Sequence, residues 1–395
     1  MSLHEYTVGD VMALARRPVT LNPDSVYREI GLRSFGRGVF HKDPVRGEKI
    51  GNKKVFHISP GDLLFSNVFA WEGAVALATD SEEGLIGSHR FMTYQVDEAV
   101  ADSRYLYYYF AFGPGLEVIR AASPGSAGPN RTLGIKSFTA QTIKIPDKIG
   151  QRHIADKLET LLRKAGATVA ASVSQVALAG SALDSTIQSV FDNGVLNGWK
   201  TCPLSEVADI NPRSEPPTAV TRVAFVPMAS VNATTGSIEV AEYKDVSSIG
   251  TGYKRFLCGD VIFARITPSM QNGKSAVFND RHTYIGYGSS EFHVIRPIRP
   301  GFSEWIHRYV RSKGFRDRAV PFMTGTAGQQ RVPASYLRDA TIPIPPDSTE
   351  QLTALNYLRN LESKHLRLRR HQLKQAETLK TLRTSILNAA FTGQL

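Results

Sequence analysis

The spacing of apolar residues changes three times along this chain and so divides it into four segments. Residues 1–147 and 198–346 carry short apolar runs broken by Gly, Pro, Asn and Ser, such as Val261-Ile262-Phe263-Ala264. Runs of this kind predict β-strands separated by turns. Within them, Tyr105–Phe110 and Trp305–Val310 have a helical spacing. These two regions therefore predict mixed α/β domains.

Residues 148–197 and 347–395 have apolar positions three and four residues apart, which predicts two long helices. The prolines at 146 and 343–346 are expected to end the extended structure before each helix. In the second helix the steps of three and four alternate without a break, as in a heptad seam. The seam positions of that helix are Leu358, Leu361, His365, Leu368, Gln372, Gln375, Leu379, Leu382, Ile386 and Ala389.

The first helix has a looser pattern that is rich in alanine. Its apolar positions are Ile154, Leu158, Leu161, Ala165, Val169, Val173, Val176, Leu183, Ile187 and Val190. A helix of this length must bury its apolar stripe, and the other helix is the obvious partner. We predict an antiparallel pair in which Leu158, Leu161, Leu183 and Ile187 meet Leu358, Leu361, Leu368, Leu379, Leu382 and Ile386. The alternative is that each helix packs only on its own domain, which usually requires a wider stripe.

Seven short motifs recur in the same order at offsets between 196 and 201 residues. Gly125-Ser126-Ala127-Gly128-Pro129-Asn130-Arg131 returns as Gly325-Thr326-Ala327-Gly328-Gln329-Gln330-Arg331, and Ile143-Lys144-Ile145-Pro146 returns as Ile342-Pro343-Ile344-Pro345. One match would mean little, but seven ordered matches indicate an internal duplication.

The predicted fold class is therefore α+β, with two similar mixed α/β domains separated by an antiparallel pair of long helices. The repeat of about 200 residues would be related by a pseudo-twofold. We predict domain 1 at 1–147, helical spacer 1 at 148–197, domain 2 at 198–346 and helical spacer 2 at 347–395.

The chain of 395 residues carries 47 Lys and Arg against 36 Asp and Glu, a net charge of +11. A basic balance suggests a polyanionic partner, because each neutralised phosphate releases counterions. No basic segment followed by an apolar one opens the chain, and no apolar run approaches 18 residues, so we expect a cytoplasmic protein without a membrane partner.

Candidate chemistry for catalysis is sparse. The two cysteines, Cys202 and Cys258, have no metal-ligand spacing and are expected to be reduced core residues. Asp62 and Asp260 follow glycine at expected strand starts, where an aspartate more often caps backbone N–H groups than binds metal. Asn211-Pro212-Arg213 lacks the second proline and the aromatic residue of a methyltransferase base-binding loop. We expect no catalytic residue, no metal ligand and no cofactor.

Three regions of expected loops offer side chains suited to DNA. Arg favours guanine edges and phosphates, and Asn and Gln favour adenine. The candidates, in chain order, are Asn67, His89, Arg90, Asn130, Arg131, Arg265, Gln271, Asn272, Lys274, Gln329, Gln330 and Arg331. The duplicated Gly-rich loop has a second interpretation, a packing turn kept by the fold. The basic second helix is likewise open to three interpretations: a phosphate contact, a solvated face or a docking surface.

The order of these motifs resembles the specificity subunits of type I restriction-modification systems. The residues that carry the resemblance are Gly198-Trp199-Lys200, Gly259–Phe263, Ile342–Pro346 with Glu350-Gln351, and Ser385–Leu395. The first copy departs from the pattern, with Lys144-Ile145-Pro146-Asp147 and Gly150-Gln151-Arg152, so its helix is open to a different start.

The resemblance implies two target-recognition domains, each reading half of a split site in double-stranded DNA, with the helix pair setting their separation. It also implies two methyltransferase (modification) subunits and restriction/translocase subunits as partners. S-adenosylmethionine, ATP and Mg would then belong to those partners and not to this chain. Two alternatives are a two-domain DNA-binding regulator or restriction inhibitor that acts alone, and a coiled-coil scaffold without nucleic acid.

Overall fold

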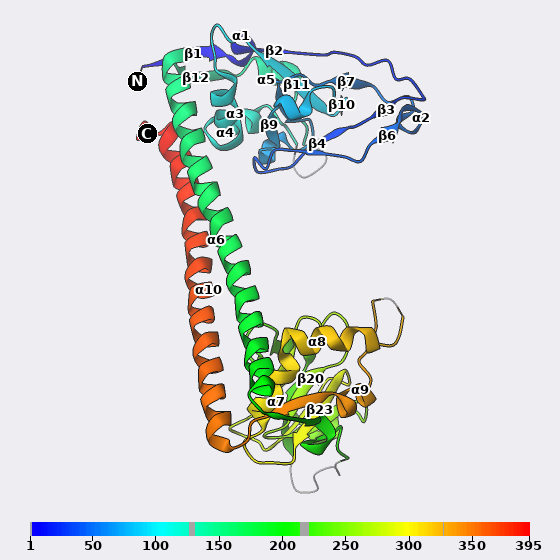
Figure 1. Ribbon diagram of the computed structural model, residues 1–395. Coiled ribbons are helices and arrows are strands. Elements are labelled where there is room, and N and C mark those ends of the chain that lie inside the picture. The colour runs from blue at the N-terminus through cyan, green and yellow to red at the C-terminus, as the bar shows by residue number, and fades with distance from the viewer. Residues whose placement is uncertain (1, 126–130, 214–220, 327) are drawn as a thin grey trace. The chain divides into compact units, whose positions relative to one another are not determined.

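The structure, a computed structural model, describes residues 2–125, 131–213, 221–326 and 328–395. Its contacts divide the chain into two compact units: unit 1 comprises Met1–Ser172 and Leu373–Leu395, and unit 2 comprises Val173–Gln372. Both long helices, α6 (Lys148–Leu196) and α10 (Ser348–Phe391), pass through both units (Figure 1). Each unit thus contains a globular part and a stretch of each helix. The four-segment division expected from the sequence stays a prediction.

The globular part of unit 1 is built on a four-stranded antiparallel sheet of order β2-β11-β8-β9. Smaller two-stranded pairs, β1-β12, β7-β10, β3-β6 and β4-β5, surround it. Its strands and α-helices in chain order are β1 (Leu3–Thr7), α1 (Val8–Val11), β2 (Met12–Leu14), β3 (Val26–Tyr27), β4 (Ile30–Leu32), β5 (Val39–His41), β6 (Val45–Arg46), α2 (Gly47–Ile50), β7 (Val55–His57), β8 (Leu63–Ser66), β9 (Val75–Leu77), β10 (Ile86–Ser88), β11 (Phe91–Val96), α3 (Ser103–Phe112), α4 (Gly115–Ala121), α5 (Ile135–Thr139) and β12 (Thr142–Pro146).

The globular part of unit 2 has an equivalent four-stranded sheet, β14-β23-β20-β21, and a second one, β18-β15-β22-β19. Its strands and α-helices are β13 (Lys200–Pro203), β14 (Ala208–Ile210), β15 (Arg222–Val226), β16 (Val231–Asn232), β17 (Ser237–Ile238), β18 (Glu242–Asp245), β19 (Lys254–Leu257), β20 (Val261–Ala264), β21 (Ser275–Val277), β22 (Ile285–Gly288), β23 (Phe292–Pro297), α7 (Ser303–Arg311), α8 (Lys313–Ala319), α9 (Ala334–Asp339) and β24 (Thr341–Ile344).

The main sheets, the terminal strand pairs and the short helices of the two units correspond. The sheet β2-β11-β8-β9 corresponds to β14-β23-β20-β21, and the pair β1-β12 corresponds to β13-β24. The helices α3, α4 and α5 correspond to α7, α8 and α9. The predicted duplication and the α+β fold class are therefore confirmed.

In one strand, a proline that was expected to end the extended structure lies inside the strand instead. Pro146 ends β12 as predicted, but Pro343 lies inside β24. The strand tolerates it because β24 pairs with β13 alone and needs no donor on its other side. The Pro343 carbonyl accepts a hydrogen bond from Trp305 Nε1 at 2.8 Å.

Aromatic rings fill the core of each globular part. In unit 1, Phe65 of β8, Tyr94 of β11, Phe110 of α3 and Phe138 of α5 meet edge to face with centroids 5.3–5.7 Å apart. Edge-to-face contacts add to the apolar burial, because the positive ring edge meets the negative ring face. This core fixes the sheet on which the candidate loops stand.

Each long helix ends by packing a phenylalanine against the globular part that belongs to the other copy. In unit 1, Phe391 of α10 contacts Tyr105 and Tyr109 of α3, with centroids 5.9 and 6.0 Å apart. In unit 2, Phe191 of α6 contacts Trp305 and Tyr309 of α7, both at 5.1 Å. The six residues form two equivalent sets at an offset of 200 residues.

The two helices also pack on each other within each unit. In unit 1, Ile154, Ala155 and Leu158 near the start of α6 share a core with Leu387 and Ala390 near the end of α10. In unit 2, Ile187 and Phe191 near the end of α6 share a core with Leu355 and Leu358 near the start of α10. Start meets end in both units, so the antiparallel pairing is confirmed and the alternative of helices packed only on their own domains is wrong.

The inward face of α10 differs from the predicted seam at Leu368, Gln375 and Leu382, which are exposed. Leu358 and Gln372 are buried, and His365, Leu379 and Ile386 are half-buried. Leu368 and Leu382, however, keep 41% and 46% of their surface exposed, so their placement on the seam is wrong.

The residues after Leu368, Gln375 and Ala389 lie further inward than the predicted positions, whereas Arg383, which follows Leu382, is exposed. Arg369 and Ala376 are half-buried, and Ala390 is buried. Glu362 is half-buried, as is the predicted seam residue Leu361. Charged side chains are buried here because the globular part of unit 2 offers them ion pairs and hydrogen bonds. The remaining predicted seam residues are buried at Leu158 and Ile187, and half-buried at Leu161 and Leu183.

A polar contact lies within the apolar seam of unit 2. Gln372 is 4% exposed, and its Nε2 donates to Gln175 Oε1 at 3.2 Å. Its own Oε1 is buried without a hydrogen-bond partner among the described residues. A buried polar group on a helix seam disfavours shifted pairings at a cost in stability.

The two long helices begin at equivalent residues despite their different sequences there. In the first copy, Asp147 Oδ1 accepts from the Gly150 N–H at 2.8 Å. In the second, Asp347 Oδ1 accepts from Thr349 and Glu350 N–H at 2.8 and 2.9 Å. An aspartate at the N-cap satisfies free N–H groups of the first turn, so both starts have the same physical cause.

By length and composition alone, one helix of the described chain, α6, is apolar enough to cross a membrane. Its uncharged stretch, 165–183, is rich in Ala and interrupted by Ser, Thr, Gln and Gly. A single helix of this kind is a weak indication, and the absence of a membrane partner stays a prediction.

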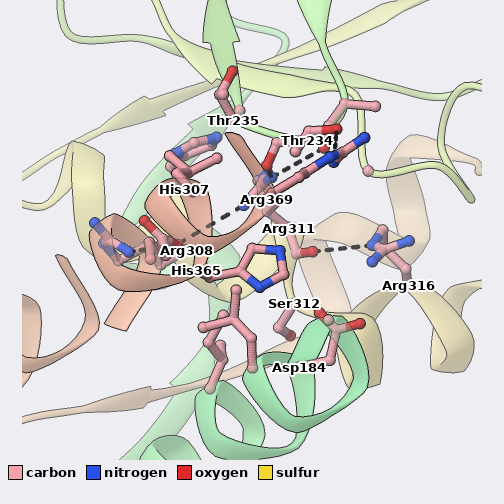
Figure 2. A pocket seen from close by; sticks show the side chains of 18 of the residues that line it. Asp184, Thr234, Thr235, His307, Arg308, Arg311, Ser312, Arg316, His365 and Arg369 are labelled. Atoms are coloured by element: carbon pink, nitrogen blue, oxygen red, sulfur yellow. Dashed lines mark hydrogen bonds and ion pairs between the residues drawn. The ribbon is translucent and has the colours of Figure 1, made fainter. Parts of the chain in front are cut away.

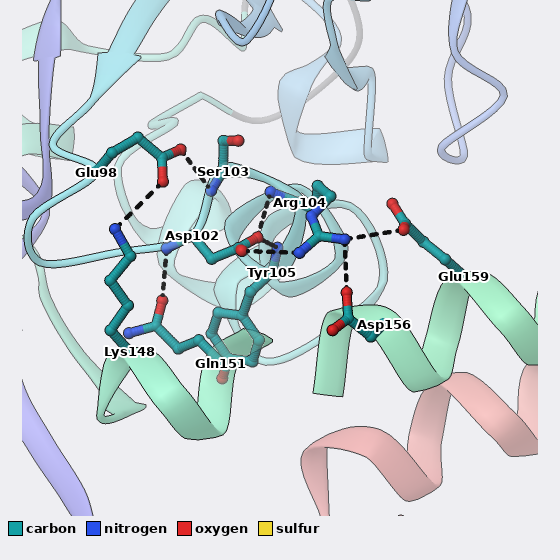
Figure 3. A network of polar contacts seen from close by, with 9 residues as sticks. All are labelled: Glu98, Asp102, Ser103, Arg104, Tyr105, Lys148, Gln151, Asp156 and Glu159. Carbon is teal, nitrogen blue, oxygen red and sulfur yellow. Dashed lines mark hydrogen bonds and ion pairs between the residues drawn. The ribbon is translucent and has the colours of Figure 1, made fainter. Parts of the chain in front are cut away.

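Opposite charges join each globular part to the start of its following helix, and their order is reversed between the copies. In unit 1, Arg104 of α3 lies 2.7 Å from Asp156 and 3.0 Å from Glu159, both on α6, and also pairs with Asp102 (Figure 3). In unit 2, Glu304 occupies the position of Arg104 and accepts from Arg359 Nε at 2.9 Å. If the two helix starts were exchanged, Arg104 would face Arg359 and Glu304 would face Glu159. The reversed order of charges therefore favours the observed pairing of each globular part with its own helix start.

We expect Arg104→Glu to lower the stability of unit 1, because it places a fourth carboxylate beside Asp102, Asp156 and Glu159. Adding Glu159→Arg should recover about 1 kcal/mol, the coupling typical of a partly exposed ion pair. Urea unfolding of the wild type, both single variants and the double variant measures this coupling. A coupling of zero would contradict the ion-pair interpretation.

We also expect Gln372→Leu to raise the stability of the helix pair by about 1 kcal/mol, because it removes a buried acceptor without a partner. The exposed Gln375→Leu serves as the matched control and should change stability little. Chemical denaturation compares the two variants. A marked loss of stability in Gln372→Leu alone would mean that the amide pair contributes favourably.

Candidate nucleic-acid interface

The three candidate regions meet in each unit through the same backbone hydrogen bonds. In unit 1, the Asn67 N–H donates to the Arg90 carbonyl at 2.7 Å, and the Leu133 N–H donates to the Asn67 carbonyl at 2.9 Å. Asn67 follows β8, Arg90 precedes β11, and Leu133 follows the Gly-rich loop. One end of the main sheet therefore carries all three regions.

Unit 2 repeats this arrangement with different side chains. The Arg265 N–H donates to the Glu291 carbonyl at 2.9 Å, and the Val332 N–H donates to the Arg265 carbonyl at 2.8 Å. Thus Asn67 corresponds to Arg265, and Arg90 corresponds to Glu291. The scaffold is shared, whereas the groups that it presents differ.

In unit 1, the candidate side chains differ in their exposure to solvent. Asn67 and His89 line one hollow together with Arg16 and Lys136. His89 and Arg90 are exposed. This hollow adds two basic residues that sequence reasoning missed, and only their position on neighbouring elements could have indicated them.

The Gly-rich loop of unit 1 is described from Arg131 onward, and Asn130 lies outside the described residues. Arg131 Nε donates to the Ser123 carbonyl at 3.0 Å, and its guanidinium lies 4.9 Å from the centroid of the Trp71 ring. An arginine held in this way supports the loop, while its half-buried side chain keeps some surface for a ligand.

In unit 2, an ion-pair network orders the end of the second Gly-rich loop. Arg331 Nη2 and Nε lie 2.7 and 3.0 Å from the two carboxylate oxygens of Glu291. Arg265 lies 3.8 Å from the same carboxylate. The Arg331 guanidinium holds the pKa of the Glu291 carboxyl below its usual range. Gln330 is half-buried and Gln329 is exposed next to this network.

The turn after β20 holds the remaining candidates. Gln271 and Asn272 are exposed. Lys274 is half-buried, and its ammonium donates to the Met228 carbonyl at 2.8 Å. In the DNA-free chain, Lys274 therefore holds two loops together, and its presence among DNA contacts stays a prediction.

A buried histidine contacts the backbone at the end of the second Gly-rich loop. His293 on β23 lies 2.8 Å from the Val332 carbonyl through Nε2 and 2.9 Å from Asn211 Nδ2 through Nδ1. Burial lowers the pKa of His293 to about 4, so its ring is neutral at pH 7. The neutral ring can donate from Nε2 and accept at Nδ1, which satisfies both contacts.

The two aspartates at the strand starts cap backbone, as expected. Asp62 accepts from the Ser59 N–H at 2.9 Å and pairs with Arg17 at 2.6 Å. Asp260 accepts from the Leu257 N–H at 2.7 Å and pairs with Arg296 at 2.7 Å. No group of three or more His, Cys, Asp or Glu suited to a metal occurs among the described residues. Both cysteines are free and half-buried.

The fold is that of proteins from type I restriction-modification systems. A chain from a structure on complex assembly and conformational transition of the type I R-M system superposes with a TM-score of 0.74, covering 100% of this chain and 98% of that one at 19% identity. The HsdS subunit from Thermoanaerobacter tengcongensis superposes with a TM-score of 0.59, covering 100% and 97%, also at 19% identity.

Two curated relatives match part of the chain in sequence. The type I restriction enzyme EcoEI specificity subunit of Escherichia coli is 36% identical over 155 residues, 39% of this chain and 26% of the relative. The EcoAI specificity subunit of the same organism is 35% identical over 158 residues, 38% of this chain and 26% of the relative. The match spans about a quarter of the length of these relatives. No protein-family model matches the chain.

Both kinds of comparison agree with the resemblance drawn from the sequence, which is thereby confirmed. The predicted fold class also agrees with the HsdS fold. Which side chains contact DNA stays a prediction.

We expect Glu291→Gln to lower the thermal stability of unit 2 modestly at pH 7, because Arg331 loses its charged partner. The folded pKa of Glu291 is depressed, so the pair contributes fully above the unfolded carboxyl pKa and is lost as pH falls through the folded value. The difference from wild type should therefore shrink as pH decreases below about 4.5. Thermal unfolding at several pH values tests this, with Glu206→Gln, at an exposed glutamate of unit 2, as a control. A difference that is constant with pH would contradict it.

Proposed function

We propose that this chain is the DNA-specificity subunit of a type I restriction-modification complex and has no catalytic role of its own. The observation that carries the proposal is the duplicated scaffold with divergent loops. Both units join three loops by the same backbone bonds, but one presents Asn67, His89 and Arg90 where the other presents Arg265 and Glu291. A bipartite DNA site with two different halves requires this combination.

The side chains available at these loops suit base edges and phosphates. Arginine can bind guanine with two hydrogen bonds, and the amides of Asn67, Gln329 and Gln330 can do the same for adenine. The net charge of +11 adds attraction to the DNA backbone that does not depend on sequence. We propose that Asn67, His89 and Arg90 contact one half-site, and that Gln329, Gln330 and Arg331 contact the other.

Release of Arg331 from Glu291 would accompany its contact with DNA. A phosphate or a guanine edge would take the place of the carboxylate in the same bidentate geometry. The ion pair therefore keeps the arginine in place before DNA arrives.

The proposed partners follow from the relatives. We propose that two methyltransferase subunits and restriction/translocase subunits assemble with this chain in the cytoplasm, and that S-adenosylmethionine, ATP and Mg are bound by those partners. The relatives, named specificity subunits, favour this proposal over a DNA-binding regulator that acts alone.

We expect cells carrying this chain with its neighbouring methyltransferase to show one methylated, split DNA motif. Replacing residues 1–147 by the equivalent region of another specificity subunit should change one half of that motif and leave the other half and the spacer intact. Methylation-sensitive sequencing of both strains measures this.

A matched replacement of residues 198–346 is the control and should change the opposite half. Duplex binding without any methylated motif would contradict the proposal and favour a regulator that acts alone. A motif that changes in both halves after one replacement would contradict the assignment of one half-site to each unit.

A further inference from the structure

Unit 2 encloses a polar cavity of about 400 Å³ where its globular part meets both long helices (Figure 2). Its walls come from α6, α7, α8 and α10, from the turn between β16 and β17, and from Gly273. The size lies within the range of small-molecule sites. None of the predicted DNA-contact residues lines it.

Arginine dominates the charge of this cavity. Four arginines line it, and a fifth, Arg359, shares the lining carboxylate of Glu304. The lining arginines are Arg308, Arg311, Arg316 and Arg369, and the lining carboxylates are Asp184, Glu304 and Glu362. Four lining cations thus stand against three lining anions, and Arg359 takes up part of the charge of Glu304, which leaves the lining with excess positive charge.

Two of the three lining carboxylates are committed to ion pairs on one side of the cavity. Glu304 binds Arg308 and Arg359. Glu362 lies 2.7 Å from Arg308 and 3.8 Å from Arg311. Asp184 makes no ion pair within 4 Å among the described residues. On the opposite side, Arg316 and Arg369 make no ion pair within 4 Å among the described residues, although the charges of Asp184 and Asp317 partly compensate that of Arg316.

Arginine donors on that side bind only neutral acceptors. Arg316 Nε donates to the Arg311 carbonyl at 3.0 Å, and Arg369 Nη1 donates to the Thr234 hydroxyl at 2.8 Å. Arg311 Nη2 donates to the Ala233 carbonyl at 3.0 Å and to the Thr234 carbonyl. The Nε of Arg311 is buried without a hydrogen-bond partner among the described residues.

Burial lowers the pKa of both Arg311 and Arg316 from their usual range. The lowering means that their positive charge is desolvated more than the neighbouring carboxylates compensate. His365 adds a second buried atom without a partner, its Nδ1. A bound acceptor stabilises the buried donor Arg311 Nε, and also His365 Nδ1 when that atom carries a proton, because a buried donor without a partner is costly.

The first copy of the fold builds the same junction without these charges. At an offset of 200 residues, the positions of Arg308, Arg311, Arg316 and Arg369 are occupied by Tyr108, Ala111, Leu116 and Val169. The positions of Glu362 and His365 are occupied by Leu162 and Ala165. The equivalence holds in space, because Tyr109 with Phe391 repeats Tyr309 with Phe191. The arginines are therefore not required to join a globular part to the helices.

We propose that this cavity binds a phosphate-class anion, held by Arg311, Arg316 and Arg369 with the Thr234 hydroxyl. The guanidinium group matches a phosphoryl group in geometry and charge and stays protonated where a lysine would not. Space of this size admits an inorganic phosphate or pyrophosphate, or the phosphoryl end of a larger molecule.

The bound anion would add charged contacts between elements that already share an apolar core and ion pairs. Arg311 and Arg316 belong to α7 and α8, whereas Arg369 belongs to α10. A ligand that all three contact would therefore fix the globular part of unit 2 on the helix pair. Binding would raise the stability of unit 2 in proportion to the ligand concentration, as linkage requires.

The test is isothermal titration calorimetry of inorganic pyrophosphate and inorganic phosphate into the full chain at constant ionic strength. We expect saturable binding at one site in the wild type. Arg369→Val, which copies the first repeat, should weaken it about tenfold or more, since a charge-assisted hydrogen bond is lost. Arg370→Gln, the exposed neighbour on the same helix, removes the same charge and should bind as the wild type does.

A second variant, Arg316→Gln, guards against misfolding of the first, and circular dichroism and thermal unfolding without ligand check both. Equal affinity in Arg369→Val, Arg316→Gln and Arg370→Gln would overturn the proposal, as would no saturable binding of either anion to the wild type.

Competition by duplex DNA identifies the source of the phosphate. If a short duplex displaces pyrophosphate and Arg369→Val weakens both equally, the phosphate belongs to the DNA backbone. If pyrophosphate and the duplex bind together, the site takes a free anion. The calorimetry does not depend on methylation or on partner subunits, so it stands apart from the test of the proposed function.

Discussion

Each long helix of this protein depends on the other, because neither can bury its apolar stripe alone. The structure meets this requirement by crossing the copies. Phe391 of the second copy packs on Tyr105 and Tyr109 of the first, and Phe191 of the first packs on Trp305 and Tyr309 of the second. Burial of these rings joins each globular part to both helices, and the candidate loops are held by a core that extends to this junction.

Duplication creates an ambiguity that the charges resolve. Two similar globular parts and two similar helices could pair in more than one way, since the apolar contacts are alike. Arg104 with Asp156 and Glu159 in one unit, against Glu304 with Arg359 in the other, distinguishes the pairings. An ion pair that is partly exposed adds little stability, but its reversal penalises the wrong partner.

The candidate interface also combines a backbone arrangement that both units share with side chains that differ between them. Backbone bonds fix three loops at one end of each main sheet, and the sequence of those loops is free to differ. The junction with the helices differs as well, since one copy fills it with apolar side chains and the other lines it with arginines. A repeated fold can therefore carry different ligands at two places in each copy.

The sequence by itself determined the duplication and the two long helices, and it predicted their antiparallel pairing and the location of the candidate loops. These follow from periodicity and from motif order, which are properties of the chain. The resemblance to specificity subunits rested on the same order. Asp62 and Asp260 could also be assigned as caps, since a Gly-Asp turn before a strand has few other uses.

Only the tertiary structure decided which face of α10 points inward. The spacing favoured Leu368 and Leu382, yet Glu362 and Arg369 are half-buried and those leucines are exposed. Apolar periodicity identifies a buried stripe only where the neighbouring surface is apolar, and here α10 also contacts a globular part that offers carboxylates, carbonyls and arginines. The partial burial of Lys274 has the same explanation. Its ammonium donates to the Met228 carbonyl, and a charge can be buried where a residue distant in the sequence supplies its partner.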